Sequence, residues 1–168
     1  VYPNPSVTMN TQDLECFGDP TGSIEAVPSG GQAPYNYNWS NGSTDSVISP
    51  LFAGGYCVTV TDTLGCMTVS CDTVQQPTQM EANLSKTDPE CYGDSTGTAT
   101  ASPTGGTPPY QFFWENGDMS TSVSNIPAGS FYVTITDANG CEVVDYVSVN
   151  HPSQIVYKVD KNPETKPR

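Results

Sequence analysis

Short alternations of apolar and polar residues run along most of this chain. Residues 35–39 place Tyr35, Tyr37 and Trp39 on one side of an extended backbone and asparagines on the other, and residues 56–61 alternate in the same way. A period of two residues is typical of a strand with one buried face. No segment shows the period of about 3.6 residues that a helix requires. The pattern therefore predicts a chain built from short β-strands.

Glycine-containing turns separate the alternating segments. They lie at residues 29–31, 41–42, 53–55 and 62–65. The Asn-Gly pair at 41–42 suits a tight turn because both residue types tolerate a positive φ. Roughly six or seven short strands divided by such turns predict a small Greek-key sandwich of the immunoglobulin type.

The second half of the chain repeats the first. The sequence CFGDPTG at residues 16–22 returns as CYGDSTG at residues 91–97, and the separation between Cys16 and Cys91, here called the repeat offset, relates the two copies throughout without a gap. Self-similarity at a fixed period indicates a repeated structural unit. The predicted fold class is therefore all-β with two tandem immunoglobulin-like sandwiches, a first repeat over 1–77 and a second over 78–152. Residues 153–168 are expected to start a third repeat or form a linker, with a disordered tail.

The positions that the two copies share have special backbone or packing demands. Trp39 and Trp114 are equivalent, and we expect both to pack in a core on a central strand. Glycines and Asn-Gly pairs make up most of the other identities, as turns require.

Composition and charge argue against two kinds of partner, nucleic acids and the membrane interior. The net charge is −13, and four of the five basic residues (Lys158, Lys161, Lys166 and Arg168) lie near the end, so that Lys86 is alone in the body. An acidic surface repels phosphate backbones, which argues against nucleic-acid binding. No apolar run reaches the roughly 18 residues that span a membrane. We therefore expect a monomeric fragment with no membrane insertion.

The spacing of the cysteines indicates structural disulfides rather than metal ligands. Cys16 and Cys66 have the same separation along the chain as Cys91 and Cys141, which predicts one disulfide per repeat, Cys16–Cys66 and Cys91–Cys141. In a plain immunoglobulin topology the two loops of each pair lie at opposite ends, so the pairing needs a modified first strand or crossover. Buried free thiols are the alternative. Six cysteines in a small acidic chain favour an oxidising, extracellular compartment.

A second cysteine pair occurs in the first repeat alone. The midpoint of Cys57 and Cys71 is residue 64, inside the turn at 62–65, so the two should face each other across a hairpin. We therefore predict a Cys57–Cys71 disulfide. The second repeat has Tyr132 and Tyr146 at these positions, which predicts a cross-strand aromatic pair.

The residue types needed for catalysis are sparse. His151 is the single histidine, which leaves no base for a hydrolytic triad, and the cysteines lack the spacing of a zinc site. No phosphate-binding glycine loop follows a strand and precedes a helix. We therefore predict no catalytic residues, no enzyme activity and no resident cofactor.

Calcium is the one cofactor that the acidic residues suggest. Asp19 and Asp62 recur as Asp94 and Asp137, and oxygen ligands on loops suit Ca²⁺. Asp62 and Asp137 also begin D-x-x-G turns, where a side-chain oxygen that caps the turn is a sufficient reason for the residue. Both interpretations stay open at this stage.

The shared pattern C-[FY]-G-D-x-T-G, G-G-x-x-P-Y-x-[YF]-x-W-x-N-G and V-T-[VI]-T-D-x-x-G-C closely resembles the SprB repeat. The same strands are similar, less closely, to PKD-type immunoglobulin domains. The SprB resemblance implies very large cell-surface proteins of Bacteroidetes, exported by the type IX secretion system. It further implies many repeats in series, no catalytic residues and a mobile adhesin of gliding motility at the bacterial cell surface.

Two functions follow as hypotheses. The first is a non-catalytic stalk or display segment of a surface adhesin, whose partners are neighbouring repeats of the same chain and a surface polysaccharide or the substratum. The second is a carbohydrate-binding accessory module of a secreted enzyme. The nine tyrosines, Tyr35 and Tyr110 among them, motivate the second hypothesis because aromatic faces suit sugars.

Overall fold

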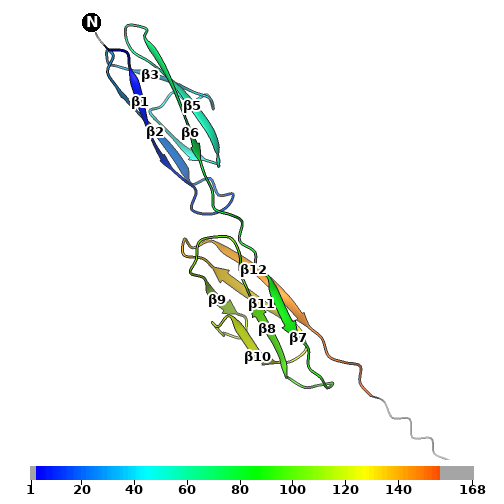
Figure 1. The fold of residues 1–168 in the computed structure, drawn as a ribbon. Coiled ribbons are helices and arrows are strands. Elements are labelled where there is room, and N and C mark those ends of the chain that lie inside the picture. The colour runs from blue at the N-terminus through cyan, green and yellow to red at the C-terminus, as the bar shows by residue number, and fades with distance from the viewer. Residues whose placement is uncertain (1–2, 156–168) are drawn as a thin grey trace, which may run out of the picture.

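The structure, a computed structural model, describes residues 3–155 (Figure 1). Every regular element in this range is a β-strand, and the strands form two sandwiches arranged end to end. No helix within the described range is long and apolar enough to cross a membrane. Residues 153–168 are expected to start a third repeat or form a linker, and residues 156–168 of this segment lie outside the described range. The boundary at 77/78 stays a prediction.

The first sandwich contains six strands in two sheets. One sheet has the order β1-β2-β4 and the other the order β3-β5-β6, with all neighbours antiparallel. The connections β2–β3, β3–β4 and β4–β5 cross between the sheets, as in an immunoglobulin-type Greek key. The strands are β1 (Ser6–Gln12), β2 (Gly22–Ser29), β3 (Asn36–Trp39), β4 (Val47–Leu51), β5 (Gly54–Thr61) and β6 (Met67–Val74).

The second sandwich repeats this order, with sheets β7-β8-β10 and β9-β11-β12. The equivalent pairings keep the repeat offset, so that Cys57–Cys71 in the first sandwich corresponds to Tyr132–Tyr146 in the second. This correspondence confirms two tandem immunoglobulin-like sandwiches. The strands are β7 (Leu84–Thr87), β8 (Gly97–Ala101), β9 (Gln111–Trp114), β10 (Ser122–Ile126), β11 (Gly129–Thr136) and β12 (Glu142–Val149).

The first strand of the second repeat is interrupted where that of the first is continuous. Asn83 has a φ of +48°, a left-handed conformation that ends strand pairing. The isolated bridge Glu81–Thr104 before it keeps the register of the equivalent pair Ser6–Ser29. The interruption is therefore local and does not shift the sheet.

The first and last strands of each repeat lie side by side and run in the same direction. The hydroxyl of Thr11 on β1 donates to the carboxylate of Asp72 on β6. Just past the ends of both strands, the amide of Gln75 donates to the Asp13 side chain at 2.8 Å. The amide of Asn150 donates to Asp88 in the same way, also at 2.8 Å. The chain therefore enters each sandwich at one end and leaves it at the other.

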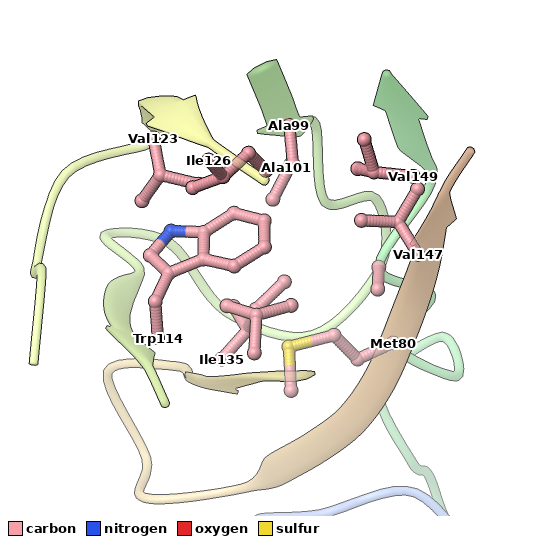
Figure 2. Close-up of a cluster of buried hydrophobic side chains, with 11 residues drawn as sticks. Met80, Ala99, Ala101, Trp114, Val123, Ile126, Ile135, Val147 and Val149 are labelled. Carbon is pink, nitrogen blue, oxygen red and sulfur yellow. The ribbon is translucent and has the colours of Figure 1, made fainter. Parts of the chain in front are cut away.

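Each sandwich has its own apolar core. The Trp114 side chain, 1 % exposed, reaches across the second core towards residues of β8 and β10 (Figure 2), and its indole N–H donates to the Ser120 carbonyl at 2.9 Å. Trp39 is equivalent and donates to the Asp45 carbonyl at 2.7 Å. The core positions of both tryptophans match the prediction, but β3 and β9 are edge strands of their sheets rather than central ones. The sequence pattern marks a strand as half-buried without showing how many neighbours it has.

Replacing Ile135 with alanine tests the second core. Ile135 on β11 has no exposed surface, so we expect the variant to lose about 2–5 kcal/mol of unfolding free energy. The matched control is Val144→Ala on the neighbouring strand, where the side chain is 62 % exposed and the loss should stay within about 0.5 kcal/mol. Urea denaturation followed by tryptophan fluorescence measures both. Equal losses would contradict the assignment of inner and outer faces.

Candidate functional site at the repeat junction

A buried carboxylate shapes the hairpin turn at the upstream end of the second sandwich. Asp137 follows β11 and is 3 % exposed. Its Oδ1 accepts the amides of Asn139 and Cys141, both at 2.9 Å, and its Oδ2 accepts the amide of Thr107 at 2.8 Å. A Cβ on Gly106 would lie 2.8 Å from that Oδ2, so glycine is needed for this close approach. Asp137 thus fixes the backbone of the turn that carries Asn139 and Cys141.

The first sandwich builds the same turn around Asp62. Its Oδ1 accepts the amides of Leu64 and Cys66 at 3.0 and 2.8 Å, and its Oδ2 accepts the amide of Gln32 at 3.1 Å. Burial raises the pKa of both aspartates, but the backbone hydrogen bonds together outweigh it and hold each pKa below its usual value. The two carboxylates are therefore ionised and occupied by backbone donors.

The four aspartates considered for calcium do not form a common site. Asp62 and Asp137 cap their own turns, whereas Asp19 and Asp94 are exposed in the loops that follow β1 and β7. Asp19 and Asp137 line the same groove, but from different repeats. Within residues 3–155 no three His, Cys, Asp or Glu side chains gather as metal ligands would. The structure thus favours the turn-capping role for Asp62 and Asp137.

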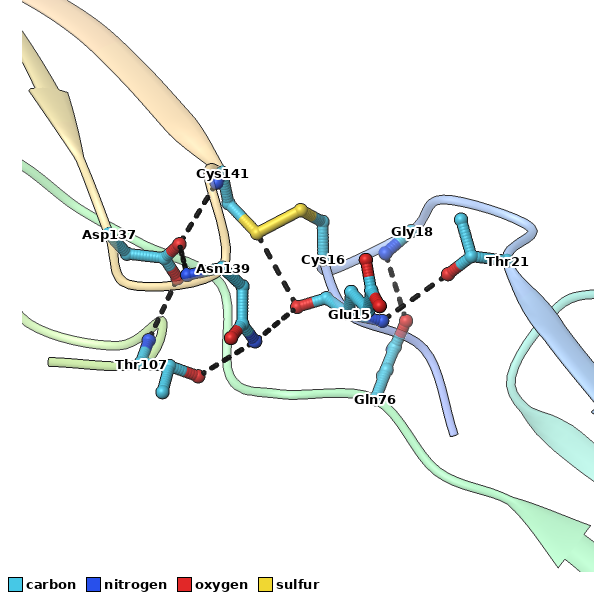
Figure 3. The surroundings of a disulfide bond; sticks show 9 residues. All are labelled: Glu15, Cys16, Gly18, Thr21, Gln76, Thr107, Asp137, Asn139 and Cys141. Carbon is cyan, nitrogen blue, oxygen red and sulfur yellow. Dashed lines mark hydrogen bonds between the residues drawn. A yellow bond between two sulfur atoms is a disulfide. The ribbon is translucent and has the colours of Figure 1, made fainter. Parts of the chain in front are cut away.

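A disulfide joins the two sandwiches (Figure 3). Cys16, in the loop between β1 and β2, bonds to Cys141 in the β11–β12 turn, with an S–S distance of 2.00 Å and a Cα–Cα distance of 5.6 Å. The loop lies at the downstream end of the first sandwich and the turn at the upstream end of the second. The bond therefore crosses the point where the two repeats meet.

Polar contacts surround the disulfide on both sides. The Asn139 amide donates to the Glu15 carbonyl at 3.1 Å and to the Thr107 hydroxyl at 3.3 Å, so one side chain connects the two repeats (Figure 3). The Cys141 sulfur lies 3.4 Å from the same Glu15 oxygen, a close contact only, because a disulfide sulfur has no hydrogen to donate. The segment that connects the two sandwiches, residues 75–80 and here called the linker, takes part through Gln76, whose side-chain oxygen accepts the Gly18 amide at 3.0 Å.

A groove of about 400 Å³ lies beside the disulfide. Phe17 and Asp19 of the first repeat, linker residues 77–80, and Val143 of the second repeat contribute to its walls. Because linker and both repeats line it, its shape depends on how the junction is held. The junction between the repeats thus combines a disulfide, side-chain hydrogen bonds and a groove.

The family model described as the SprB repeat matches residues 8–44 and residues 83–119. The chain carries two SprB repeats. The matched segments are related by the same repeat offset, and each runs from β1 or β7 past the tryptophan of β3 or β9. The chain is thus a repeat module of a surface-associated family.

Similarity to solved structures is distant. The crystal structure of DIP-gamma IG1+IG2 has a TM-score of 0.41 at 11 % identity, over 90 % of this chain and 99 % of that one. The C-terminal 282-residue fragment of intimin, in complex with the intimin-binding domain of its translocated receptor, has a TM-score of 0.42 at 11 % identity, over 86 % of this chain and 64 % of that one. No curated protein sequence matches the chain.

The disulfide pairing between SprB repeats corrects one prediction. We predicted Cys16–Cys66 and Cys91–Cys141, but the structure joins Cys16 to Cys141 and leaves Cys66 and Cys91 without a disulfide. Cys66 precedes β6, whereas Cys16 lies near the end of that strand, where the Leu14 amide donates to the Gln75 carbonyl. The eight residues of β6 span roughly 26 Å, far beyond the reach of a disulfide.

The second cysteine pair lies where the hairpin geometry predicted it. Cys57 and Cys71 are direct partners of β5 and β6 and form a disulfide with an S–S distance of 2.05 Å. Tyr132 and Tyr146 are partners of β11 and β12, with ring centroids 5.3 Å apart. One position in the SprB repeat thus holds either a covalent or an aromatic cross-strand pair.

Sequence reasoning missed the polar residues of the junction. Asn139 and Gln76 have no equivalents of the same type in the other repeat, since Leu64 and His151 occupy those positions. Glu15 takes part through its backbone carbonyl, which no side-chain pattern marks. The usable signal was the expected placement of the two cysteine loops at opposite ends of a sandwich.

Replacing Asp137 with asparagine tests the turn. Because the folded-state pKa lies below the usual value of about 3.9, ionised Asp137 stabilises the fold above that pH, and this stabilisation disappears as the pH falls through the folded-state pKa. We expect Asp137→Asn to lose about 1–3 kcal/mol of unfolding free energy at pH 7 and progressively less below pH ~4. Denaturant titrations between pH 7 and pH 2 measure this. Asp94→Asn, an exposed control, should change little, and a loss at pH 7 that persists undiminished at pH 2 would contradict the role.

Proposed function

We propose that this chain is a non-catalytic segment of the stalk of a large secreted surface adhesin. It acts as a stiff spacer that holds a binding part away from the cell and displays it. The SprB repeats support a cell-surface module. We further infer export by the type IX secretion system and a role in gliding motility, both of which rest on the family resemblance alone.

The inter-repeat disulfide is the observation that carries the proposal. Two independent domains on a short linker change their relative orientation freely by default. Here Cys16–Cys141 adds a second covalent connection beside the linker, and the Asn139 and Gln76 hydrogen bonds add polar contacts to it. Two connections restrict bending and twisting of one sandwich against the other. A spacer needs this property, whereas a catalytic domain does not.

The direction of the strands suits the same role. Because β1 and β6 are parallel neighbours, each repeat receives the chain at one end and passes it on at the other. Repeats connected in this way add length instead of folding back on one another. The result is the end-to-end arrangement of the two sandwiches (Figure 1).

Small-angle X-ray scattering tests the spacer. The intact chain should scatter as an extended, rigid pair of domains. In the double variant Cys16→Ser/Cys141→Ser we expect both repeats to stay folded, while the scattering requires an ensemble of bent forms with a smaller mean radius of gyration. The physical reason is the loss of the second covalent connection between the repeats.

The matched control removes the other disulfide. Cys57→Ser/Cys71→Ser lowers the stability of the first repeat, by about 3 kcal/mol in the chain-entropy model, and should leave the extended scattering profile unchanged. A compact, folded-over profile for the intact chain would contradict the proposal. So would identical profiles for the two double variants.

An exposed aromatic face favours the second candidate function, carbohydrate binding. Tyr132, Tyr146 and Phe113 are 48, 53 and 52 % exposed and lie on the outer side of the sheet β9-β11-β12. Aromatic rings with a polar edge suit the apolar faces of sugars. The tyrosines considered from sequence are less available, since the hydroxyls of Tyr35 and Tyr110 donate to the carbonyls of Gly30 and Gly105.

Polysaccharide binding tests this face. In affinity electrophoresis against insoluble and soluble glucans, chitin and alginate, Tyr132→Ala/Tyr146→Ala should weaken any retention about tenfold, because the rings would supply the stacking surface. Tyr92→Ala is the control, since Tyr92 is 50 % exposed at the far end of the repeat. Retention that is unchanged in the double variant would rule out this face as the binding surface.

A further inference from the structure

Two cysteines of the chain have no disulfide, and their positions are not arbitrary. Cys66 is equivalent to Cys141, and Cys91 is equivalent to Cys16, at the repeat offset. The two residues that form the inter-repeat bond therefore have counterparts at the two outer ends of the pair. Cys66 lies at the upstream end of the first sandwich and Cys91 at the downstream end of the second.

The Cys66 turn has the same geometry as the Cys141 turn. Asp62 accepts the Cys66 amide at 2.8 Å, and Asp137 accepts the Cys141 amide at 2.9 Å. The backbone that presents each sulfur is therefore held by the same carboxylate contact. In the second repeat, this backbone positions the Cys141 sulfur that bonds to Cys16 of the preceding repeat.

The Cys91 loop is the uncovered counterpart of the Cys16 loop. Cys91 is exposed, and the adjoining Tyr92 packs edge-on against His151 with ring centroids 4.5 Å apart. A shallow hollow of about 180 Å³ lies between Tyr92, Asp94 and Pro127. In the first repeat the corresponding loop lies against the second repeat and its linker. The downstream end of the second repeat is thus an open copy of a surface that the structure shows covered.

Apolar side chains flank the two cysteines. Leu64 and Met67 are 61 and 69 % exposed in the Cys66 turn, where the second repeat has Asn139 and Glu142. Tyr92 is half exposed beside Cys91. If the outer ends meet as the inner ends do, loop 90–92 faces turn 64–67, and these apolar groups come together. An apolar contact there would replace the Asn139 hydrogen bond of the inner junction.

We propose that Cys66 and Cys91 are the halves of further inter-repeat disulfides. Cys91 bonds to the hairpin-turn cysteine of a following SprB repeat, and Cys66 bonds to the loop cysteine of a preceding one. The partner is thus another repeat of this kind, for which a second copy of this chain is the available probe. The inference goes beyond the proposed function because it does not depend on what the stalk displays.

The bond forms by thiol–disulfide exchange with an external disulfide, such as oxidised glutathione or a protein disulfide. The Cys91 thiolate attacks that disulfide, forms a mixed disulfide and releases one thiol of the oxidant. The Cys66-type thiolate of the next repeat then attacks the mixed disulfide at the Cys91 sulfur and releases the second thiol. Two cysteine thiols are oxidised, one external disulfide is reduced to two thiols, and the two cysteine protons end on these.

Mixing two single variants tests the pairing in the full chain. Cys66→Ser retains only the Cys91 thiol, and Cys91→Ser retains only the Cys66 thiol. In a glutathione redox buffer at high protein concentration, the equimolar mixture should give a disulfide-linked dimer on non-reducing gels. Each variant alone should give at least tenfold less dimer. Peptide mapping of the dimer should find Cys91 joined to Cys66, with Cys16–Cys141 intact in both chains.

A four-repeat chain tests the same geometry without the requirement for two molecules to meet. Pro3 is equivalent to Thr78, so joining Pro152 of one copy to Pro3 of a second continues the register of the array. Cys91 of the first copy should then bond to Cys66 of the second within one molecule, because linkage raises the effective concentration to about the millimolar range.

Three results would overturn the proposal. One is a Cys91–Cys91 dimer from Cys66→Ser alone that is as abundant as the mixed dimer. Another is a Cys16–Cys66 or Cys91–Cys141 bond in the mapped chain. The third is the absence of the Cys91–Cys66 bond in both the mixture and the four-repeat chain. None of these readouts uses the scattering comparison, so failure here is separable from failure of the spacer function.

Discussion

The parallel arrangement of the first and last strands in each sandwich determines most of what this chain can do. Because β1 and β6 run in the same direction side by side, the chain leaves every repeat at the end opposite to its entry. The loop after β1 and the turn before β6 are therefore forced apart, and each becomes available to a neighbouring repeat instead of to its own. The Cys16–Cys141 bond and the Asn139 contact both depend on this separation.

Local features of the fold could be predicted from sequence, and features between repeats could not. The Cys57–Cys71 pairing depends on a turn only a few residues away, so counting outward from 62–65 locates both partners in register. The spacing of Cys16 and Cys66 in the first copy equals that of Cys91 and Cys141 in the second. Spacing along the chain does not show, however, which end of a sandwich each loop occupies. The edge position of Trp39 was missed for a related reason, since alternation describes the faces of a strand and not its neighbours in the sheet.

The acidic turns show how two chemical interpretations of one residue type can be separated. Asp62 and Asp137 had the spacing of turn caps and the charge of calcium ligands. In the structure each accepts three backbone amides from two different segments, which uses the oxygens that a cation would need. Their lowered pKa reflects those amide donors against the opposing effect of burial. The charge therefore serves the architecture of the turn, and through Cys141 it serves the junction.

The covalent topology has a mechanical consequence. Cys16 and Cys141 are 125 residues apart in sequence, and the loop that their bond closes contains most of both sandwiches. Tension applied to the segments before Cys16 and after Cys141 passes through the sulfur–sulfur bond and bypasses the chain between them. That enclosed chain would extend to roughly 400 Å if it were free. While the bond is intact, force can peel away β1 or β12 but cannot draw this length out, so the disulfide sets an upper limit on how far the pair can stretch.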